Sequence, residues 1–376
     1  MKICLDISPA VYRRAGIGRY TRELTSALLD LGGEDEYVGF YNRASGANLD
    51  GCFSEMTHLT RDLPDKPWRL SVLTAHFLGI SQDRWMPGIH IFHATDNLLP
   101  LLSEVKSVFT LHDLAFRHHP ETHTCLNRLF LRTMMPWFLR KADTVVADSE
   151  STRRDALKFY KLKQSKIRVI YPGVHPRFRP VHDLERLAAV RRRYALPARF
   201  LLFVGSIEPR KNLETLLEVF RNLRPDEVRL VIAGERGWRY RTTLECLQSS
   251  DLRRKLILTG FVPDDDLPVL YSLAEAFVYP SLYEGFGLPV LEAMACGTPV
   301  ITSNSSSLPE VASDAAIMVA PRDVRGWLRA LDQIIQNSVL KAELRQRGLR
   351  RARGFSWEST ACKMRKVYQE VYGHCN

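Results

Sequence analysis

Residues 279–301 constrain the fold more than any other part of the sequence. The apolar run 276–279 that leads into them has the character of a buried strand. A short helix is expected to follow, because Pro289 is favoured in a first helical turn and Gly297 just past a helix end. A second strand is expected over 299–301. Strand, loop, helix and strand make one βαβ unit, so the chain is predicted to contain a parallel α/β sheet.

The loop of this unit carries Gly285 and Gly287 between the carboxylates of Glu284 and Glu292. Such a loop directs backbone N–H groups at a ligand above the sheet, and the helix dipole favours an anion there, a phosphate above all. Glycine lets the ligand approach the backbone closely. A carboxylate beside a phosphate is better suited to hydroxyl groups, as in the ribose contacts of dinucleotide folds. The loop therefore predicts a phosphate flanked by polyol groups, and the alternative is a structural turn with solvent-facing glutamates.

The composition is that of a soluble globular protein with two domains. A chain of 376 residues is too long for one ordinary core. It is 45% hydrophobic and 25% charged, and no apolar run approaches the length of a membrane span. Residues 1–7 are too short an apolar run for a signal peptide and are expected to form a strand. The seven cysteines include no C-x-x-C pair and cannot all pair internally, which favours a reducing cytoplasm.

The net charge of +11 indicates an anionic partner. Nucleic acid, an anionic membrane surface and small anionic ligands would each account for it. The sequence has no helix-turn-helix, zinc-finger or RRM signature, so no nucleic-acid partner is expected.

Short apolar strands alternate with helices through both halves of the chain. The strands expected in the first half are 2–7, 37–41, 89–94, 107–111, 144–148 and 167–171, and those in the second are 200–204, 228–233, 256–259 and 316–319, besides the two described above. Residues 42–65 are polar and give no assignment. The basic stretch 176–198 is expected to be mostly helical and to link the halves. A last helix is expected over 357–372.

Spacing leaves the role of several residues in the first half open. A loop with Gly16 and Gly18 is expected over 8–18, before a helix from about residue 19 to 31. Its glycines lie too far beyond the strand for a dinucleotide fingerprint, so spacing alone favours a plain surface loop. His93 and His112 end two expected strands, which is where open α/β sheets bind ligands. A histidine at a strand end is also often a structural group.

Two helices of the first half are expected to be amphipathic. Residues 67–85 have helical spacing, with Trp68, Val72, Leu73 and Phe77 on the apolar stripe. In residues 125–142, apolar and basic side chains alternate, and Pro136 interrupts the pattern: the apolar ones are Leu126, Leu129, Phe130, Met134, Trp137 and Phe138, and the basic ones Arg128, Arg132, Arg140 and Lys141. Such a helix can lie on an anionic membrane leaflet or face the protein core with basic groups in solvent. Both interpretations stay open.

The full string YPSLYEGFGLPVLEAMACGTPVI over 279–301 resembles the donor-site signature of the family 4 retaining nucleotide-sugar glycosyltransferases. The resemblance covers nearly the whole chain and is strongest in the second half. It implies the GT-B fold, an α/β architecture of two Rossmann-like domains facing across a cleft. The implied domains are 1–175 on the acceptor side, 176–355 for the nucleotide-sugar donor, and 356–376 as a C-terminal helix that crosses back to the first domain.

The resemblance also implies roles for individual residues. Glu284 is expected to hold hydroxyl groups of the donor sugar, Lys211 to bind the donor diphosphate, and His112 to face the donor sugar. Many family members have arginine where Ser206 stands, so Arg210 is expected to compensate. The residues expected to bind the donor are Gly16, Gly18, Ser206, Gly260, Phe261, Val262, Gly285, Phe286, Gly287, Leu288 and Glu292, the last through the ribose.

No metal ion or other cofactor is expected. The acidic run 264–266 resembles a metal-binding motif of glycosyltransferases of the other main fold, but it precedes an expected helix at 267–274, so helix capping accounts for it. The histidines at 118, 119 and 123 lack the i, i+4 spacing of a zinc helix. Arg210, Lys211 and a helix N-terminus could carry the leaving-group charge that a metal would otherwise carry.

The implied reaction moves a sugar from a nucleotide sugar to an acceptor with retained anomeric configuration. Residues 207–212 and the Glu-Gly-Phe-Gly loop resemble bacterial mannosyltransferases of surface-polysaccharide assembly, including lipopolysaccharide, which use GDP-mannose. The expected acceptor is a saccharide or a lipid-linked saccharide, reached in the cytoplasm or at the inner face of the plasma membrane. The alternatives are a UDP-sugar-dependent enzyme, a related phosphorylase or epimerase of this fold, and a non-catalytic nucleotide-sugar-binding protein.

Overall fold

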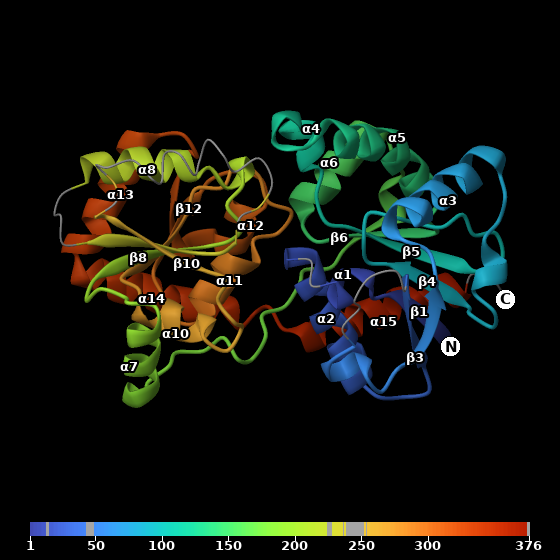
Figure 1. The fold of residues 1–376 in the computed structure, drawn as a ribbon, viewed down its shortest axis with the longest axis horizontal. Helices are drawn as coiled ribbons and strands as arrows, with labels where there is room; N and C mark the ends of the chain where they lie inside the picture. Colours follow the sequence, from blue (N-terminus) through green and yellow to red (C-terminus); the bar gives the residue numbers. More distant parts are fainter. Residues whose placement is uncertain are drawn as a thin grey trace. The chain divides into compact units, whose positions relative to one another are not determined.

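The computed structural model describes residues 1–12, 15–42, 49–223, 228–235, 237, 252 and 254–373. The chain forms two compact units. The first consists of Met1–Arg117, Thr124–Gly173 and Ser356–Asn376, and the second of His118–His123 and Val174–Phe355. Each unit is a parallel sheet between two layers of helices (Figure 1).

The first unit is built on a seven-stranded sheet of order β3-β2-β1-β4-β5-β6-β7, in which every pairing is parallel. Its strands are β1 Lys2–Asp6, β2 Glu36–Asn42, β3 Thr57–Arg61, β4 Ile91–Ala94, β5 Lys106–Leu111, β6 Thr144–Ala147 and β7 Ile167–Val169. The strands β1, β4, β5 and β6 are almost continuously buried, as expected for strands covered on both faces.

Helices cover both faces of this sheet. They are α1 Ser8–Val11, α2 Ala15–Asp30, α3 Asp65–Leu78, α4 Ala115–His118, α5 Cys125–Lys141, α6 Glu150–Tyr160 and α15 Trp357–Gly373. One core lies between the sheet and α3, α5 and α6, and the other lies between the sheet and α1, α2 and α15 (Figure 1). Ser149 begins α6 as its N-cap, accepting a hydrogen bond from the Thr152 backbone.

The C-terminal helix α15 belongs to the first unit, which confirms the predicted crossing back of the chain. Its buried face includes Met364 and Tyr368, which pack in the same core as Tyr20 of α2. The Tyr368 hydroxyl lies 2.7 Å from Nδ1 of His93 in β4, and the Thr360 hydroxyl donates to the Tyr171 carbonyl at 2.8 Å. These buried contacts fix the helix against the sheet.

Gly173 allows the chain to pass close to the start of α15, and we predict that Gly173→Ala destabilises the first unit. A Cβ atom at this position would overlap the backbone of Ser356 and Trp357, which no side-chain rotation can relieve. The expected loss is about 1–3 kcal/mol or more, measured by urea unfolding. Gly373→Ala, in α15 itself, is the control because its Cβ would meet open space. Equal stability of the two variants would contradict the prediction.

The second unit has a six-stranded sheet of order β10-β9-β8-β11-β12-β13, again parallel throughout. Its strands are β8 Phe200–Val204, β9 Arg229–Ala233, β10 Leu256–Gly260, β11 Ala276–Tyr279, β12 Val300–Ser303 and β13 Ala316–Val319. Its helices are α7 Leu184–Arg193, α8 Leu213–Asn222, α10 Leu267–Leu273, α11 Leu288–Ala295, α12 Leu308–Ala312, α13 Val324–Gln336 and α14 Ser338–Ala352. Short 3-10 turns in the chain are Gly51–Phe53, Asp83–Trp85, Pro120–Thr122, Gln164–Lys166, Pro209–Lys211 and Ser313–Ala315.

The structure corrects several sequence-based expectations in the first unit. Gly16 and Gly18 lie within α2, which begins at Ala15, and not in a loop. Strand β3 lies in the stretch that gave no assignment. Helix α3 ends at Leu78, where Gly79 adopts φ 68° as its C-cap, and Phe77 is exposed instead of buried. Helix α5 runs through Pro136 without a break.

The acidic run before α10 does not cap that helix, contrary to the sequence-based explanation. Asp266 occupies the N-cap position, but its side chain makes no capping hydrogen bond. Its carboxylate accepts hydrogen bonds from Arg193 at 2.6 Å and from the Tyr194 hydroxyl at 2.8 Å. Asp266 therefore joins α10 to the end of α7. Of the segment expected to be mostly helical, only 184–193 forms a helix.

Candidate active site

The loop after β8 brings two basic side chains under the strand ends of the second unit. The loop forms a 3-10 turn, Pro209–Lys211, and Asn212 closes it with φ 54°. The Asn212 amide donates to the carbonyl oxygens of Pro280 at 2.9 Å and Pro321 at 2.7 Å. These two bonds tie the loop to the segment that follows β11, so Arg210 and Lys211 are held beside the Glu284 loop.

Glu284 accepts hydrogen bonds from four side chains. Its Oε1 lies 2.7 Å from Lys211 Nζ, 3.0 Å from the Tyr279 hydroxyl and 2.6 Å from the Ser281 hydroxyl. Its Oε2 accepts from Arg210 Nη1 at 2.9 Å. Lys211 and Glu284 are both buried, so this is an ion cluster shielded from water rather than a surface salt bridge.

A second buried carboxylate completes the cluster on the far side of Arg210. Glu208 Oε1 accepts from Arg210 Nη2 at 2.7 Å, and Arg210 Nη1 also donates to the Tyr283 carbonyl at 2.8 Å. Within the described part of the chain, Glu208 Oε2 is buried and has no hydrogen-bond partner. The sequence analysis did not single out Glu208. Its place two residues before Arg210, in a turn rich in charge, was the available signal.

The cluster contains two carboxylates and two cations, and its electrostatics keep Glu284 ionised. Burial alone would raise the pKa of Glu284, but the charges of Arg210 and Lys211 and the hydrogen bonds to it outweigh burial and lower the pKa to about 2. Burial lowers the pKa of Lys211, and Glu284 offsets part of that effect. Burial raises the pKa of Glu208. A carboxylate that stays charged at neutral pH can accept hydrogen bonds from substrate hydroxyl groups.

The glycine loop leads directly into α11, as predicted. Gly287 is the N-cap with φ 114°, a conformation that favours glycine, and a Cβ there would lie 2.7 Å from Leu308 Cδ2. The Ser307 hydroxyl contacts the carbonyl oxygens of Glu284 at 2.9 Å and Phe286 at 2.6 Å, which fixes the shape of the loop. The first N–H groups of a helix have no intrahelical partner, so that of Leu288 can bind an anion.

Glu292 lies in the second turn of α11 and is buried. Its Oε2 accepts a hydrogen bond from the Tyr271 hydroxyl at 3.0 Å. The predicted base-contact segment, Gly260, Phe261 and Val262, follows β10 in the same unit. Gly260 has φ 70°, its carbonyl accepts from the Gly234 N–H at 2.9 Å, and the Phe261 side chain is exposed. Ser206 lies at the end of β8, before the turn that carries the cluster.

The remaining predicted site residues belong to the first unit. Gly18 permits close packing of two helices, because a Cβ there would lie 2.6 Å from the Pro9 carbonyl oxygen, whereas a Cβ at Gly16 would meet open space. Both ring nitrogens of His112 contact acceptors: Nδ1 lies 2.6 Å from Asp148 Oδ2 and Nε2 lies 2.8 Å from the Thr95 carbonyl. The His112 ring is therefore engaged within its own unit.

The two buried histidines of the first unit have opposite pKa shifts. Burial lowers the pKa of His112, but the charge and hydrogen bond of Asp148 and the bond to Thr95 outweigh it and raise the pKa to about 9. Burial, and secondarily the charge of His112, lowers the pKa of His93 to about 3. His93 lies between the hydroxyl groups of Tyr368 and Thr110. His93 is thus a structural group that is neutral at pH 7.

Among the described residues, no group of three or more His, Cys, Asp and Glu side chains could hold a metal ion. Asp264 pairs with Arg177 at 3.5 Å, and Asp266 is engaged by Arg193. None of the helices that the structure describes has an apolar stretch of the length that a membrane span requires.

Two parallel α/β units, with a carboxylate–cation cluster and a glycine loop at the strand ends of one of them, define an enzyme of the glycosyltransferase class. Family models agree: residues 191–353 match "Glycosyl transferases group 1" and residues 14–178 match "Glycosyltransferase Family 4". The O-antigen chain mannosyltransferase B of Escherichia coli is 30% identical over 384 residues, covering 98% of this chain and 100% of that protein. The chain therefore belongs to the family 4 glycosyltransferases, and its activity is that of a hexosyltransferase.

Another relative agrees with this family, and solved structures agree with the fold. The D-inositol 3-phosphate glycosyltransferase of Thermobispora bispora is 32% identical over 390 residues, covering 97% of this chain and 83% of that protein. Sucrose-phosphate synthase from Thermosynechococcus elongatus is similar in structure with a TM-score of 0.79 at 21% identity, over 100% of both chains. WaaG, a glycosyltransferase involved in lipopolysaccharide biosynthesis, has a TM-score of 0.73 at 15% identity, over 98% of this chain and 99% of that one. The predicted GT-B fold is confirmed.

Proposed function

We propose that the chain transfers mannose from GDP-mannose to a saccharide or lipid-linked saccharide, with retention of the anomeric configuration. The choice of mannose rests on one observation: the chain is similar, over nearly its full length, to a protein named as an O-antigen chain mannosyltransferase. Shorter matches point the same way: serotype-specific mannosyltransferase WbdA of Escherichia coli is 36% identical over 228 residues, 59% of this chain and 28% of that protein. The donor nucleotide and the stereochemical course are part of the proposal.

The ion cluster supports specific roles in this reaction. Glu284 accepts hydrogen bonds from hydroxyl groups of the donor sugar and at the same time holds Arg210 and Lys211 in position. The two cations, with the N-terminus of α11, stabilise the diphosphate as its charge develops in the transition state. No metal ion is needed in this scheme, because the positive charge comes from side chains of the protein. The donor phosphate takes the acceptor proton.

Glu292 binds the donor ribose in this proposal, and Glu292→Gln should weaken donor binding more than turnover. An amide keeps the size of the side chain but loses the charge that strengthens hydrogen bonds from hydroxyl groups. We expect KM for the donor to rise by about tenfold, corresponding to roughly 1.4 kcal/mol, with kcat within about threefold of wild type. Steady-state kinetics against donor concentration measure both. A fall in kcat with unchanged KM would contradict the ribose assignment.

A thermal-shift panel with GDP, UDP, ADP and dTDP, with and without EDTA, tests the donor. A nucleotide at about a hundred times its dissociation constant adds roughly 2.7 kcal/mol to the free energy of unfolding. We expect GDP to be the only one of the four nucleotides that raises Tm, and we expect EDTA to leave that rise unchanged. A shift with UDP alone would replace the donor and keep the reaction class. Loss of the GDP shift in EDTA would contradict the metal-free scheme.

Turnover separates an enzyme from a binding protein. The purified chain, GDP-mannose and a membrane extract as the source of acceptor should release GDP and transfer labelled mannose to the lipid fraction. Binding of GDP-mannose without transfer to any saccharide or lipid acceptor would favour a non-catalytic nucleotide-sugar-binding protein. A lipid-linked acceptor would place the reaction at a membrane surface in the cytoplasm.

A further inference from the structure

Glu208 carries a buried carboxylate oxygen that the ion cluster does not satisfy. The residue is 1% exposed, and its Oε1 accepts a hydrogen bond from Arg210 Nη2 at 2.7 Å. None of the residues that the structure describes donates a hydrogen bond to Oε2. An oxygen of an ionised carboxylate is unfavourable in a buried place without a donor, and such atoms are rare in folded proteins. Glu284 differs in this respect, because both of its oxygens accept from the side chains around it.

The backbone holds Glu208 in this buried place. The residue is extended, with φ −145° and ψ 154°, and its carbonyl accepts from the Lys211 N–H at 3.0 Å. Ile207 is bonded to one segment on both sides: its N–H donates to the Glu235 carbonyl at 2.9 Å, and its carbonyl accepts from the Gly237 N–H at 3.1 Å. That segment lies against Glu208, because a Cβ on Gly237 would be 3.3 Å from Glu208 Cβ, whereas the Glu235 side chain is exposed.

The titratable side chains that interact with the Glu208 carboxylate come from its own turn and from the segment after β11. Arg210 and Lys211 favour its ionised form, and Glu284 disfavours it. The Tyr279 hydroxyl stays neutral, because burial and Glu284 raise its pKa. With both carboxylates ionised, the two cations are balanced. Burial nevertheless raises the pKa of Glu208, while that of Glu284 is lowered, so Glu208 is the carboxylate of the cluster that binds a proton more readily.

A bound diphosphate would change the charge balance of the cluster. In the proposed function, Arg210 and Lys211 contact the diphosphate of the donor, which adds negative charge beside them. A nearby negative charge makes a buried carboxylate harder to keep ionised. Arg210 would then be shared between two carboxylates and the diphosphate. A proton on Glu208 would leave its positive charge to Glu284 and the donor.

We propose that Glu208 is a positioning residue that takes up a proton from solvent when the donor diphosphate binds. The proton goes to Oε2, and Oε1 keeps the hydrogen bond that orients Arg210. Neutral Glu208 no longer competes with the diphosphate for the charge of Arg210. Donor binding is therefore linked to pH through Glu208. The inference rests on the proposed function, because it needs the diphosphate at Arg210 and Lys211.

The test is calorimetric binding of GDP-mannose and of UDP-glucose to the full chain without acceptor. Both phosphates of a sugar nucleotide are esterified, so neither titrates near pH 6 as the terminal phosphate of GDP does. PIPES and imidazole differ in ionisation enthalpy, and the difference in binding enthalpy between them gives the number of protons taken up. We expect uptake of about half a proton near pH 6.5, and a donor affinity that falls roughly threefold per pH unit from about pH 6 to 7.5.

Glu208→Gln should remove this pH dependence. Glutamine keeps a carbonyl oxygen as acceptor for Arg210 and resembles the protonated acid. We expect no proton uptake, with a donor affinity equal to that of wild type near pH 6 and about fivefold higher at pH 7.5. A residue that only held Arg210 in place would give a different result, because its loss would weaken donor binding at every pH.

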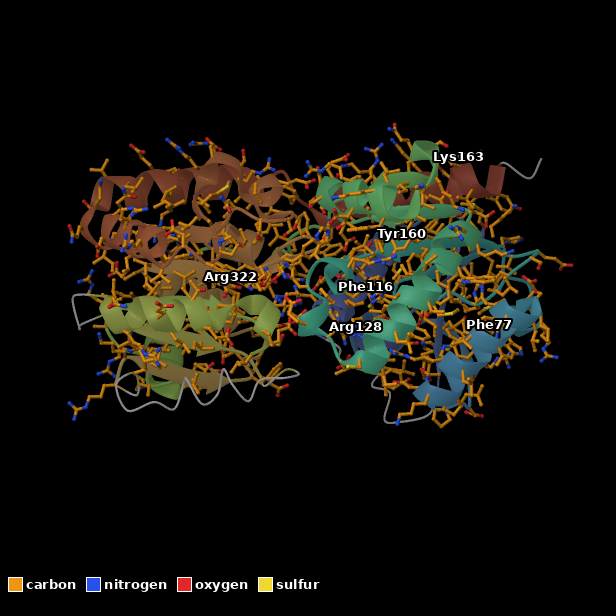
Figure 2. The ribbon with its side chains drawn as sticks, turned by 90° about the horizontal axis from the view of Figure 1, so that it is seen from above. Phe77, Phe116, Arg128, Tyr160, Lys163 and Arg322 are labelled. Carbon is orange, nitrogen blue, oxygen red and sulfur yellow. The ribbon has the colours of Figure 1, made fainter. Side chains whose placement is uncertain are left out.

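Two variants of the same unit are matched controls, and Tm establishes that each variant is folded. Glu275→Gln removes a carboxylate that is also shared between an arginine and a lysine, and whose pKa is lowered by them. Arg322→Gln removes an exposed cation, labelled in Figure 2, next to Pro321, whose carbonyl accepts from the Asn212 amide. Both controls should keep the proton uptake and the pH dependence of wild type.

Three outcomes would overturn the inference. Donor binding by wild type without proton uptake would leave the proposed function standing and would mean that ordered water satisfies Oε2. Uptake that persists in Glu208→Gln would exclude Glu208 as the group. Uptake that grows as the pH rises toward about 8.5 would assign the proton to Lys211, whose pKa is lowered by burial.

The same experiment separates this inference from the proposed function. Binding of neither sugar nucleotide would remove both. Binding of UDP-glucose alone, with the expected proton uptake, would support the role of Glu208 and replace the nucleotide of the proposed donor.

Discussion

Glu284→Gln should lower the rate of sugar transfer by about 10²- to 10³-fold, the range seen when one preorganised group that stabilises transition-state charge is removed. The substitution removes the negative charge that Lys211 and Arg210 both contact. The two cations then lose their common anchor, and the sugar hydroxyl groups lose a charged acceptor. We expect the loss in kcat and kcat/KM alike, because the interaction matters most in the transition state.

Glutamine is a sharper test than alanine at this position. In Glu284→Ala, the buried Lys211 would lose its counter-charge and the hydroxyl groups of Tyr279 and Ser281 their acceptor, and breaking a buried pair costs about 3–5 kcal/mol. Glu284→Ala is therefore expected to lose stability as well as activity. In glutamine, the side-chain carbonyl still accepts from the two hydroxyl groups.

A matched control comes from Glu275, which is also shared between an arginine and a lysine. Its carboxylate accepts from Arg199 at 2.9 Å and from Lys341 at 2.7 Å. Glu275→Gln should leave transfer within about twofold of wild type, because this pair is partly exposed and lies outside the Glu284 cluster. Near-normal turnover of a folded Glu284→Gln enzyme would remove Glu284 from the site.

The sequence predicted the strands and the glycine loop well because their signals are local. Pro289 and Gly297 bracket α11 in the positions that proline and glycine prefer, and the apolar runs at β8 and β11 have the lengths found in the structure. Strand β3 has the sequence THLTR, which neither alternates nor forms an apolar run. It lies at the edge of the sheet, where pairing with β2 is enough to form it.

The predicted start of α2, at about residue 19, was wrong because Gly16 and Gly18 were interpreted as loop residues. Gly18 is in the helix for a tertiary reason, the close approach of the Pro9 carbonyl, which no local pattern reveals. Phe77 lies on the apolar stripe of α3 by spacing and yet faces solvent, because each side of that helix carries apolar residues. Spacing identifies a stripe but does not identify what covers it.

The ion cluster could be predicted from the sequence only in part. Arg210, Lys211 and Glu284 were each assigned to the donor through the resemblance, but as a phosphate clamp and a separate sugar contact. The structure joins them in one cluster because the Asn212 bonds bring together loops whose contacting residues lie 68 to 74 positions apart in the chain. Glu208 was identified from its contact with Arg210 in that cluster, and no sequence motif had indicated it.

Between pH 6 and pH 9.5 the stabilising contribution of His112 should be lost. Its pKa is raised from 6.5 to about 9 in the folded state, so the folded protein binds the proton more tightly than the unfolded chain. That contribution is fully present below pH 6.5 and disappears as the pH rises through about 9. A shift of this size corresponds to at most about 3 kcal/mol.

The measurement is urea unfolding, followed by circular dichroism, of wild type, His112→Gln and His93→Gln at several pH values. The difference in unfolding free energy between wild type and His112→Gln should shrink as the pH rises from 6 to 9.5. The contribution of His93 depends on pH in the opposite direction. Its pKa is lowered to about 3, so its contribution to stability is present above pH 6.5 and falls as the pH drops toward 3.

Each histidine variant is the control for the other, because the two groups titrate in separate windows within the same unit. The His93→Gln difference should be flat above pH 7, where His93 is neutral in both states, while the His112→Gln difference is changing. A His112→Gln difference that stays constant from pH 6 to 9.5 would mean that the ring is not protonated between Asp148 and Thr95. In that event Nδ1 of His112 would accept a hydrogen bond from a protonated Asp148, whose pKa is raised by burial, and Nε2 would still donate to the Thr95 carbonyl.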